Sequence, residues 1–573
     1  MPQLQINQGP QDALLYDNTR SYFTNVGYVR TSNFQLELRD VDPQNTPTFG
    51  STVQFVIPKA ADLMGPVDLM IDLKKVDTWT DAVGDDGKAY LAWVESLGCA
   101  IIDKITFSVG SHDIETITGD QLYIANELMR ADEQRFAKNT ILKTGRPMMR
   151  VNTGTGTNTW TGVVDENLAY DNSGRLIASV TSSGSTETLV KYDAKKLIIP
   201  LGLFFTKHPS QYFPLAAIAG CNDVRISVKL RNLKEVIMGR GAEGVTAGKI
   251  SGGGTALNSI PQIGIESCQL RTHYVHVTGP EASLLMNKEH VRLLKLWQPH
   301  SVQASITATN NTGDSLTDQK ASMTGTAKTL FSFELPFLHP VQEIIIVIRK
   351  VSEMSDSTDL TVSATSSSTV DMKGACKNYF AFQGGNKDPN IESHAYTTKE
   401  NGTTDCNEAY LRVNGFKLTL NGQERHPSLS QSGISRDYLM NRLMPMMHSN
   451  TSTGFVDVHD GHAASSVTSD AISTTVGEVD AITTLADYND DNLKALGEMY
   501  DRKEIYVYPF AINPEGQNPS GAVNFSKVSH AKLEITGTAF NSLGTAVNYQ
   551  CDVWGVHYNW LQIKDGRAIT SFA

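Results

Sequence analysis

The sequence lacks the features that would place it in a membrane or in a disulfide-stabilised class. None of its six cysteines stands in a Cys-x-x-Cys pair, so buried reduced thiols are a better interpretation than a disulfide or zinc framework. No apolar run approaches the ~18 residues that a membrane-spanning helix needs. The first residues show neither the basic start nor the apolar core of a secretory signal. We therefore expect the chain to be made and folded in a reducing compartment such as the cytosol.

Clusters of basic residues are also lacking. Lysine and arginine together number 49 against 61 acidic residues, which gives a formal net charge of −12 over 573 residues. Proteins that wrap nucleic acid hold its phosphates with clustered Lys and Arg side chains. The charge balance therefore argues against direct binding of nucleic acid.

Catalytic motifs are scarce as well. The chain contains no Gly-x-Ser-x-Gly nucleophile elbow and no His-x-His pair of the kind that cupins use for a metal. Residues 244–249 resemble a phosphate-binding loop, but Glu243 replaces its first glycine and Ile250 replaces its Ser or Thr. A flexible surface loop is the better interpretation of this stretch.

Two polar stretches carry weak signals for metal binding. Acidic residues at positions 487–498 have the spacing of a calcium loop, but Asn492 occupies the position where a glycine makes the sharp turn. The start of a helix with acidic residues is favoured there. His459 and His462 lie in a polar loop without an identifiable third ligand. We therefore predict no catalytic residue, no cofactor, no metal site and no enzymatic activity.

Two similar stretches organise what the chain does contain. Residues 196–231 hold two apolar runs around a Pro-containing turn and end in strict alternation, with an apolar residue at every second position of 224–230. Residues 504–536 follow the same order and alternate in the same way over 531–535. Because a strand points successive side chains to opposite faces, each alternation predicts a strand with one buried and one solvated face.

Short motifs recur in the same order in both halves of the chain. The matched pairs are 55–58 with 333–336, 104–107 with 417–420, 126–129 with 441–444, and 224–226 with 531–533. A collinear repeat of this kind indicates a duplicated domain. About eight strands per copy, joined by long and uneven loops, predict an all-β chain of two eight-stranded antiparallel jelly roll sandwiches with a few short helices. A pair of immunoglobulin-like sandwiches is the alternative, but it has fewer strands and shorter loops.

Long polar stretches interrupt both series of strands. Residues 131–190, 351–405 and 449–484 are rich in Ser, Thr, Gly or Asn, and we expect them to gather mostly at one outer end of the subunit, with some touching neighbouring subunits. Residues 1–24 are polar without periodicity and indicate an extended N-terminal arm.

Sequons for N-glycosylation occur within this polar material. Three of them, Asn310, Asn401 and Asn450, fall in the polar loops, and a fourth is Asn524. Chance explains such motifs in a chain rich in Thr, Ser and Asn, and glycosylation outside the secretory pathway is the alternative.

A carbohydrate-binding or carbohydrate-active sandwich is the rival from another class. It predicts clustered exposed aromatic residues or paired carboxylates in one cleft. The six tryptophans are scattered instead, and the even spacing of Trp554 and Trp560 within an apolar stretch indicates one packed face of a strand.

Several stretches resemble the major capsid proteins of the nucleocytoplasmic large DNA viruses of eukaryotes. The segments that carry the resemblance are YFTNVGYVRTSNF (22–34), the strand, hairpin and helix segment 92–128, IIPLGLFFTKHPSQYFPLAAIAGCNDVRISVKL (198–230), LPFLHPVQEIIIVIRK (335–350) and VYPFAINPEGQNPSGAVNFSKVSHAKLEI (507–535). They cover both halves in the order of the family. The quoted motifs favour this family over the coats of tailless bacterial viruses that share its double-barrel plan. Residues 210–213 depart from a Gly-Leu-Ala-Leu-like segment that is common in the family.

The resemblance implies a structural protein of the virion. It implies an N-terminal arm at 1–24, a first jelly roll domain at 25–279 and a second at 280–573. Three chains would form a pseudo-hexagonal capsomer that tiles an icosahedral shell. The implied partners are neighbouring capsomers, minor capsid and penton proteins, and an inner viral membrane, and synthesis would take place in the host cytoplasm.

Overall fold

The computed structural model describes most strands of both halves of the chain. The described residues are 33–74, 88–94, 96–128, 176–183, 186–191, 196–220, 222–240, 249–250, 263–307, 328–351, 370–371, 379–380, 382, 409–425, 433–448, 505–516, 518–541 and 546–571.

Two antiparallel sheets from the first half of the chain form the first sandwich. One sheet has the order β1-β14-β3-β10, with β9 also paired to β3, and the other has the order β2-β11-β5-β6. The strands of the first sheet are β1 (Phe34–Val41), β14 (Ile265–Val277), β3 (Leu63–Leu73), β10 (Phe213–Pro214) and β9 (Lys196–Pro200). Those of the second are β2 (Thr52–Ile57), β11 (Val224–Leu230), β5 (Ile102–Val109) and β6 (His112–Thr118).

Two antiparallel sheets from the second half form the second sandwich. One has the order β15-β25-β17-β22, with β23 paired to β17 and β26 to β25, and the other has the order β16-β24-β19-β20, with β21 paired to β19. The first contains β15 (His290–Thr307), β25 (Ala546–Lys564), β17 (Pro340–Lys350), β22 (Tyr506–Pro509), β23 (Val523–Asn524) and β26 (Arg567–Thr570). The second contains β16 (Lys328–Glu334), β24 (Ala531–Asn541), β19 (Ala409–Leu420), β20 (Gln423–Glu424) and β21 (Ile434–Ser435).

The two sandwiches place equivalent strands in the same order. In chain order, the first uses β1, β2, β3, β5, β6, β9 with β10, β11 and β14, and the second uses β15, β16, β17, β19, β20 with β21, β22 with β23, β24 and β25. Each sandwich therefore has eight strand positions in two four-position sheets. The prediction of a duplicated all-β jelly roll is confirmed, and motifs 104–107 and 417–420 lie in the equivalent strands β5 and β19.

Short helices lie between the strands. They are α3 (Leu97–Ala100), α4 (Gly119–Leu128), α6 (Leu233–Val236), α7 (Gly279–Asn287), α11 (Arg436–Tyr438), α12 (Met444–Met447), the 3-10 turns η1 (Phe204–Thr206), η2 (Pro209–Gln211), η3 (Leu215–Ala217) and η10 (Phe525–Lys527), and the π-helical turn η6 (Leu439–Leu443). Helix α4 matches the helix predicted after the hairpin of β5 and β6. The hairpin turns at Gly110, whose φ of 61° suits a glycine.

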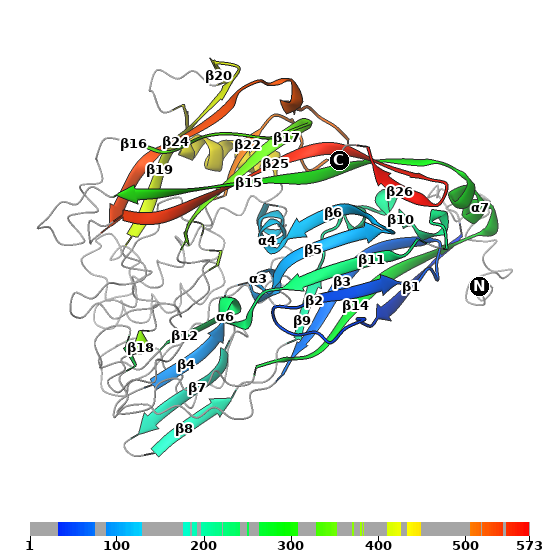
Figure 1. Cartoon of the computed structure of the whole chain (residues 1–573), viewed down its shortest axis with the longest axis horizontal. Coiled ribbons are helices and arrows are strands. Elements are labelled where there is room, and N and C mark those ends of the chain that lie inside the picture. The colour runs from blue at the N-terminus through cyan, green and yellow to red at the C-terminus, as the bar shows by residue number, and fades with distance from the viewer. Residues whose placement is uncertain are drawn as a thin grey trace, which may run out of the picture.

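The sandwiches lie side by side, and α7 connects them at one end, which we call the linker end (Figure 1). Strand β15 runs from α7 to the opposite end, the loop end. Lys350, which precedes the long stretch 351–405, lies at the loop end beside Tyr549 of β25. His448, which precedes the stretch 449–484, contacts Glu343 near the middle of the same sheet. The three stretches themselves fall mostly outside the described residues.

Two predictions about loops and strands are wrong in part. Residues 131–190 were expected to form a loop, but 176–183 and 186–191 form the hairpin of β7 and β8, and β7 pairs with β4 (Lys88–Trp93). The threonines, valines and isoleucine of these segments favour strand, and the pairing of β7 with β4 and β8 stabilises it. The sequence also predicts a strand over 522–528, but only β23 forms there, because 525–527 form a 3-10 turn. Strand β12 (Ile237–Arg240) also pairs with β4, so that β12, β4, β7 and β8 form a separate four-stranded sheet. Strands β13 (Lys249–Ile250) and β18 (Val370–Asp371) form a two-stranded sheet.

Strand β11 has the burial that its alternation predicts. Val224, Ile226 and Val228 are fully buried, whereas Arg225 and Lys229 are exposed. Strand β17 is different, because nearly every residue in it is buried. Its uninterrupted apolar run fits a strand covered on both faces.

The two faces of β17 belong to different cores. Ile344, Ile346 and Ile348 pack in the core of the second sandwich. Ile345 and Val347 point the other way and join the core of the first sandwich. The sheet of β15, β25 and β17 therefore closes one sandwich and packs against the other. We call its outer side the junction face.

Candidate functional site

A buried cluster of charges lies at the loop end of the junction face. Arg349 of β17 donates through Nη2 to Asp120 Oδ2 at 2.9 Å and to Asp552 Oδ2 at 2.8 Å. Its Nε also donates to Asp552 at 3.2 Å, and its Nη1 to the carbonyl of Tyr379 at 3.2 Å. Asp120 lies at the start of α4 in the first sandwich, so this cluster joins the two sandwiches. We call it the junction cluster.

The junction cluster extends into the first sandwich through a second arginine. Arg231, which directly follows β11, has its Nη2 3.7 Å from Asp120 Oδ1. Its guanidinium lies 3.7 Å from the ring centre of Tyr379, and that of Arg349 lies 5.0 Å from the same ring. Cations over an aromatic face are attracted by its negative quadrupole. Tyr379 therefore acts as a shared platform for both arginines.

Charge pairing outweighs burial in the junction cluster. Burial alone would raise the pKa of Asp120, but the charges of Arg349 and Arg231 hold it below its usual value. Burial opposes the charge of Arg349, but Asp120 and Asp552 raise its pKa above the usual value. Burial raises the pKa of Tyr379 to about 12. Asp120, Arg349 and Tyr379 therefore each keep one charge state near neutral pH.

A second buried cluster lies further along β17. His448, which follows α12, has its Nε2 2.9 Å from Glu343 Oε2 of β17 and its Nδ1 3.3 Å from Glu515 Oε1. Burial would lower the pKa of His448, but its hydrogen bonds to Glu343 and Glu515 raise it to about 9. The imidazolium thus bridges two carboxylates. We call this group the histidine cluster.

Lys295 supports the histidine cluster from β15, which is separated from β17 by β25 in the same sheet. Its Nζ donates to the carbonyls of Pro514 and Gly516, which flank Glu515. Burial lowers the pKa of Lys295 to about 8. The lysine therefore holds the turn that presents Glu515 to His448.

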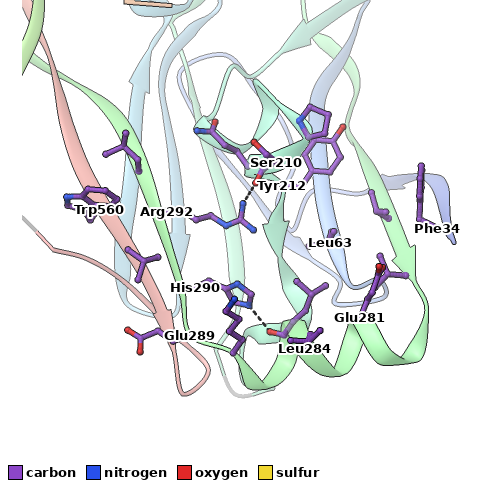
Figure 2. A pocket seen from close by; sticks show the side chains of 18 of the residues that line it. Phe34, Leu63, Ser210, Tyr212, Glu281, Leu284, Glu289, His290, Arg292 and Trp560 are labelled. Atoms are coloured by element: carbon purple, nitrogen blue, oxygen red, sulfur yellow. Dashed lines mark hydrogen bonds between the residues drawn. The ribbon is translucent and has the colours of Figure 1, made fainter. Parts of the chain in front are cut away.

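An open apolar groove of about 1250 Å³ lies at the linker end (Figure 2). We call it the linker groove; its walls are the ends of β1 and β14, helix α7, the start of β15, residues 209–212 and 518–519, and Trp560. Phe34 is 51% exposed, Leu36 62% and Leu284 61%. Exposed apolar surface concentrated in one place marks a contact surface more often than isolated exposed residues do.

Trp560 corrects one prediction. It was expected to share a packed face with Trp554, which is 4% exposed in the junction, but Trp560 is 43% exposed and lines the linker groove. At this end of β25 the residues of the opposite parity are the buried ones, since Leu561 and Ile563 pack in the core that contains the first sandwich.

The remaining candidates from the sequence are not brought together into a site. Asn310, Asn401 and Asn450 lie outside the described residues, as do His459 and His462. Among the residues that the structure describes, no group of three metal-binding side chains and no helix suited to spanning a membrane is found. The described cysteines, Cys99, Cys268 and Cys551, are buried free thiols, as predicted for them.

Sequence reasoning missed both buried clusters. A signal was present, since Arg349 follows the apolar run of β17 and Asp552 interrupts an apolar stretch of β25. Charged residues in strands that are otherwise buried need partners. Which partners they meet depends on how the two sandwiches pack.

Comparisons with known proteins agree with this architecture. A sequence model of the family described as "Major capsid protein N-terminus" matches residues 21–265. The chain is 22% identical over 580 residues to the major capsid protein of Phaeocystis pouchetii virus, and the alignment covers 97% of this chain and 96% of that protein.

Solved structures show the same fold at low sequence identity. The VP54 protein of PBCV-1 aligns with a TM-score of 0.51 and 17% identity, over 96% of this chain and all of that one. The Faustovirus major capsid protein aligns with a TM-score of 0.52 and 10% identity, over 96% of this chain and 94% of that one.

Proposed function

We infer that this chain, which belongs to the double jelly roll major capsid proteins of the nucleocytoplasmic large DNA viruses, builds the icosahedral shell of such a virus as a homotrimer. Its place is the virion, where many copies assemble into the capsid. One observation carries the trimer: two sandwiches with the same strand order stand side by side in one chain. Three such chains around one axis present six similar corners, so a closed three-fold particle fits a near-hexagonal lattice.

The domain division that we propose follows the same logic. The arm is residues 1–24, the first jelly roll domain is 25–279, and the second is 280–573. The junction cluster supports a fixed angle between the domains, because Asp120 and Arg349 come from different sandwiches. A fixed angle is needed if every capsomer is to present the same six corners.

The partners that we propose are other copies of the chain, minor capsid and penton proteins, and an inner viral membrane. Synthesis in the host cytoplasm fits the reduced cysteines. We propose no enzymatic role. The support is that the buried titratable side chains of both clusters bind one another: Arg349 is paired with Asp552, and His448 with Glu343.

Light scattering coupled to size exclusion tests the trimer directly. We expect one species of about three times the 62.6 kDa chain mass, and pseudo-hexagonal particles in electron micrographs of the same fraction. Obligate interfaces of this kind bury more than ~2,000 Å², so the trimer should persist on dilution to micromolar concentration. A stable monomer under these conditions, with monomers alone recovered from dissociated virions, contradicts the proposal.

A further inference from the structure

One arginine in the linker groove has no acidic partner among the residues that the structure describes. Arg292 of β15 donates to the carbonyl of Ser210, and its buried Nε has no hydrogen-bond partner. It forms no ion pair with any residue that the structure describes. Figure 2 shows Arg292 between Trp560 and the turn that carries Ser210 and Tyr212.

The charges near this arginine are engaged elsewhere or are distant. Glu289 has its Oε2 3.7 Å from Lys564 Nζ, and its Oε1 accepts from Gln562. Glu281 lies on α7, on the far side of the groove from Arg292 (Figure 2). Burial lowers the pKa of Arg292, with no compensating carboxylate. A desolvated guanidinium in an apolar groove favours an occupant that carries a carboxylate beside apolar side chains.

The chain itself contains a segment with these properties. Residues 12–17 read Asp-Ala-Leu-Leu-Tyr-Asp, four apolar or aromatic residues between two acids. Asp12 and Asp17 are the only acidic residues in 1–32. This part of the chain precedes Phe34, which lines the groove.

We propose that residues 12–17 dock in the linker groove, with the leucines against the apolar wall and an aspartate on Arg292. The length of the chain permits it, because the 17 residues from Asp17 to Phe34 span up to about 60 Å when extended. The two bonds that a carboxylate makes to a guanidinium suit the free Nε of Arg292. The docked segment also covers apolar surface on β1 and α7 that is otherwise exposed. The trimer is not required for this contact, so it goes beyond the proposed function.

Photo-crosslinking of the full-length protein tests the docking. The probe is p-benzoylphenylalanine at position 15, and mass spectrometry maps the crosslinked peptides. We expect crosslinks to the start of β1, to α7 and to the start of β15. Arg292→Glu should reduce their yield about tenfold, since a charge-assisted hydrogen bond contributes about that factor. Adding Asp12→Lys and Asp17→Lys to Arg292→Glu should restore the yield.

The controls separate docking from misfolding and from other occupants. The same probe at position 4 lies outside the acidic segment and should give few groove crosslinks. An unchanged melting temperature shows that Arg292→Glu folds. If Arg292→Glu fails to fold, two milder variants replace it, Arg292→Gln and the double variant Asp12→Asn with Asp17→Asn, and they should reduce the crosslink yield equally. The mass of the product shows whether the segment occupies its own groove or that of a neighbouring copy, and both support the proposal. Crosslinks mainly to other surfaces, to lipid or to another protein, or a yield independent of residue 292, overturn it.

Discussion

The junction cluster and the histidine cluster share one strand, yet they do different work. Arg349 and Glu343 both lie on β17 with side chains on the junction face. Arg349 reaches across to Asp120 of the first sandwich, whereas Glu343 meets His448 and Glu515 of the second. The first cluster thus joins the sandwiches, and the second ties segments within one of them.

Their chemistry differs as well. The junction cluster pairs carboxylates with guanidinium groups, which do not lose their charge in the range where proteins are stable. The histidine cluster depends on an imidazolium, whose charge is lost at mildly alkaline pH. The comparison indicates that the Asp120–Arg349 pair between the sandwiches keeps its charges at mildly alkaline pH, while the contact of His448 inside the second sandwich loses one.

The largest expected effect comes from breaking the junction cluster. Arg349→Met leaves Asp120 and Asp552 buried without this partner, and the loss of an ion from a buried pair costs about 3–5 kcal/mol. We expect the free energy of unfolding, from urea denaturation at fixed protein concentration, to fall by that amount. A loss below 1 kcal/mol contradicts the assigned role.

The second prediction concerns His448 and pH. Its pKa is raised in the folded protein to about 9, above the usual value near 6.5. Because the folded-state pKa is raised, protonated His448 contributes its full stabilisation of the folded state below pH ~6.5, and this contribution to the free energy of unfolding is lost as the pH rises through about 9. The urea midpoint of the wild type should therefore decline between these values.

His448→Gln provides the comparison for this pH dependence. It should lower stability by about 1–3 kcal/mol at pH 6 and flatten the decline towards pH 9. His530→Gln is the matched control, because the side chain of His530 is 76% exposed. A slope that is identical in His448→Gln and in the wild type argues against the assignment.

A contact without charges tests whether the clusters alone hold the sandwiches together. Gly566, beside β26, accepts from Ala219 N at 3.0 Å and from Asn222 Nδ2 at 2.8 Å in the first sandwich. Its φ is +75°, and an added Cβ would lie 2.4 Å from the Cβ of Ala219. Gly566→Ala should cost about 1–3 kcal/mol through strain and overlap, measured by urea denaturation. Gly422→Ala is the control, since it has a similar φ of +80° but no atom within 4 Å. Equal losses in both variants would assign the cost to backbone strain alone.

The smallest effect is expected at an exposed ion pair. Arg271 Nε lies 2.8 Å from Asp40 Oδ1 on the solvated side of the first sandwich. Water screens this pair, so Arg271→Met should change the free energy of unfolding far less than Arg349→Met does. Adding 0.5 M salt should reduce the difference further. A loss comparable to that of Arg349→Met would remove the distinction between buried and exposed pairs.

The sequence by itself determined the strands and their duplication. Alternation at 224–230 predicted a strand buried on one face, and β11 has that burial. The repeat of 104–107 at 417–420 predicted equivalent positions, which β5 and β19 occupy. These predictions hold because side-chain alternation and turn residues are local properties of the chain. The prediction of a loop at 131–190 was wrong in part because the pairing of β7 with β4 is a long-range contact that local sequence does not show.

Only the tertiary structure decided the contacts between the sandwiches. Asp120 and Arg349 are 229 residues apart, and no periodicity links them. Trp554 and Trp560 have the same parity on β25, but one is buried and the other lines the linker groove. At the linker end the residues of the other parity are buried instead, as Leu561 and Ile563 show. Arg292 looks like an ordinary strand residue in the sequence, and only the structure shows that its Nε is buried without a hydrogen-bond partner among the described residues. Burial and pairing depend on which surfaces meet, and in this chain those surfaces come from segments that folding brings together from opposite halves of the sequence.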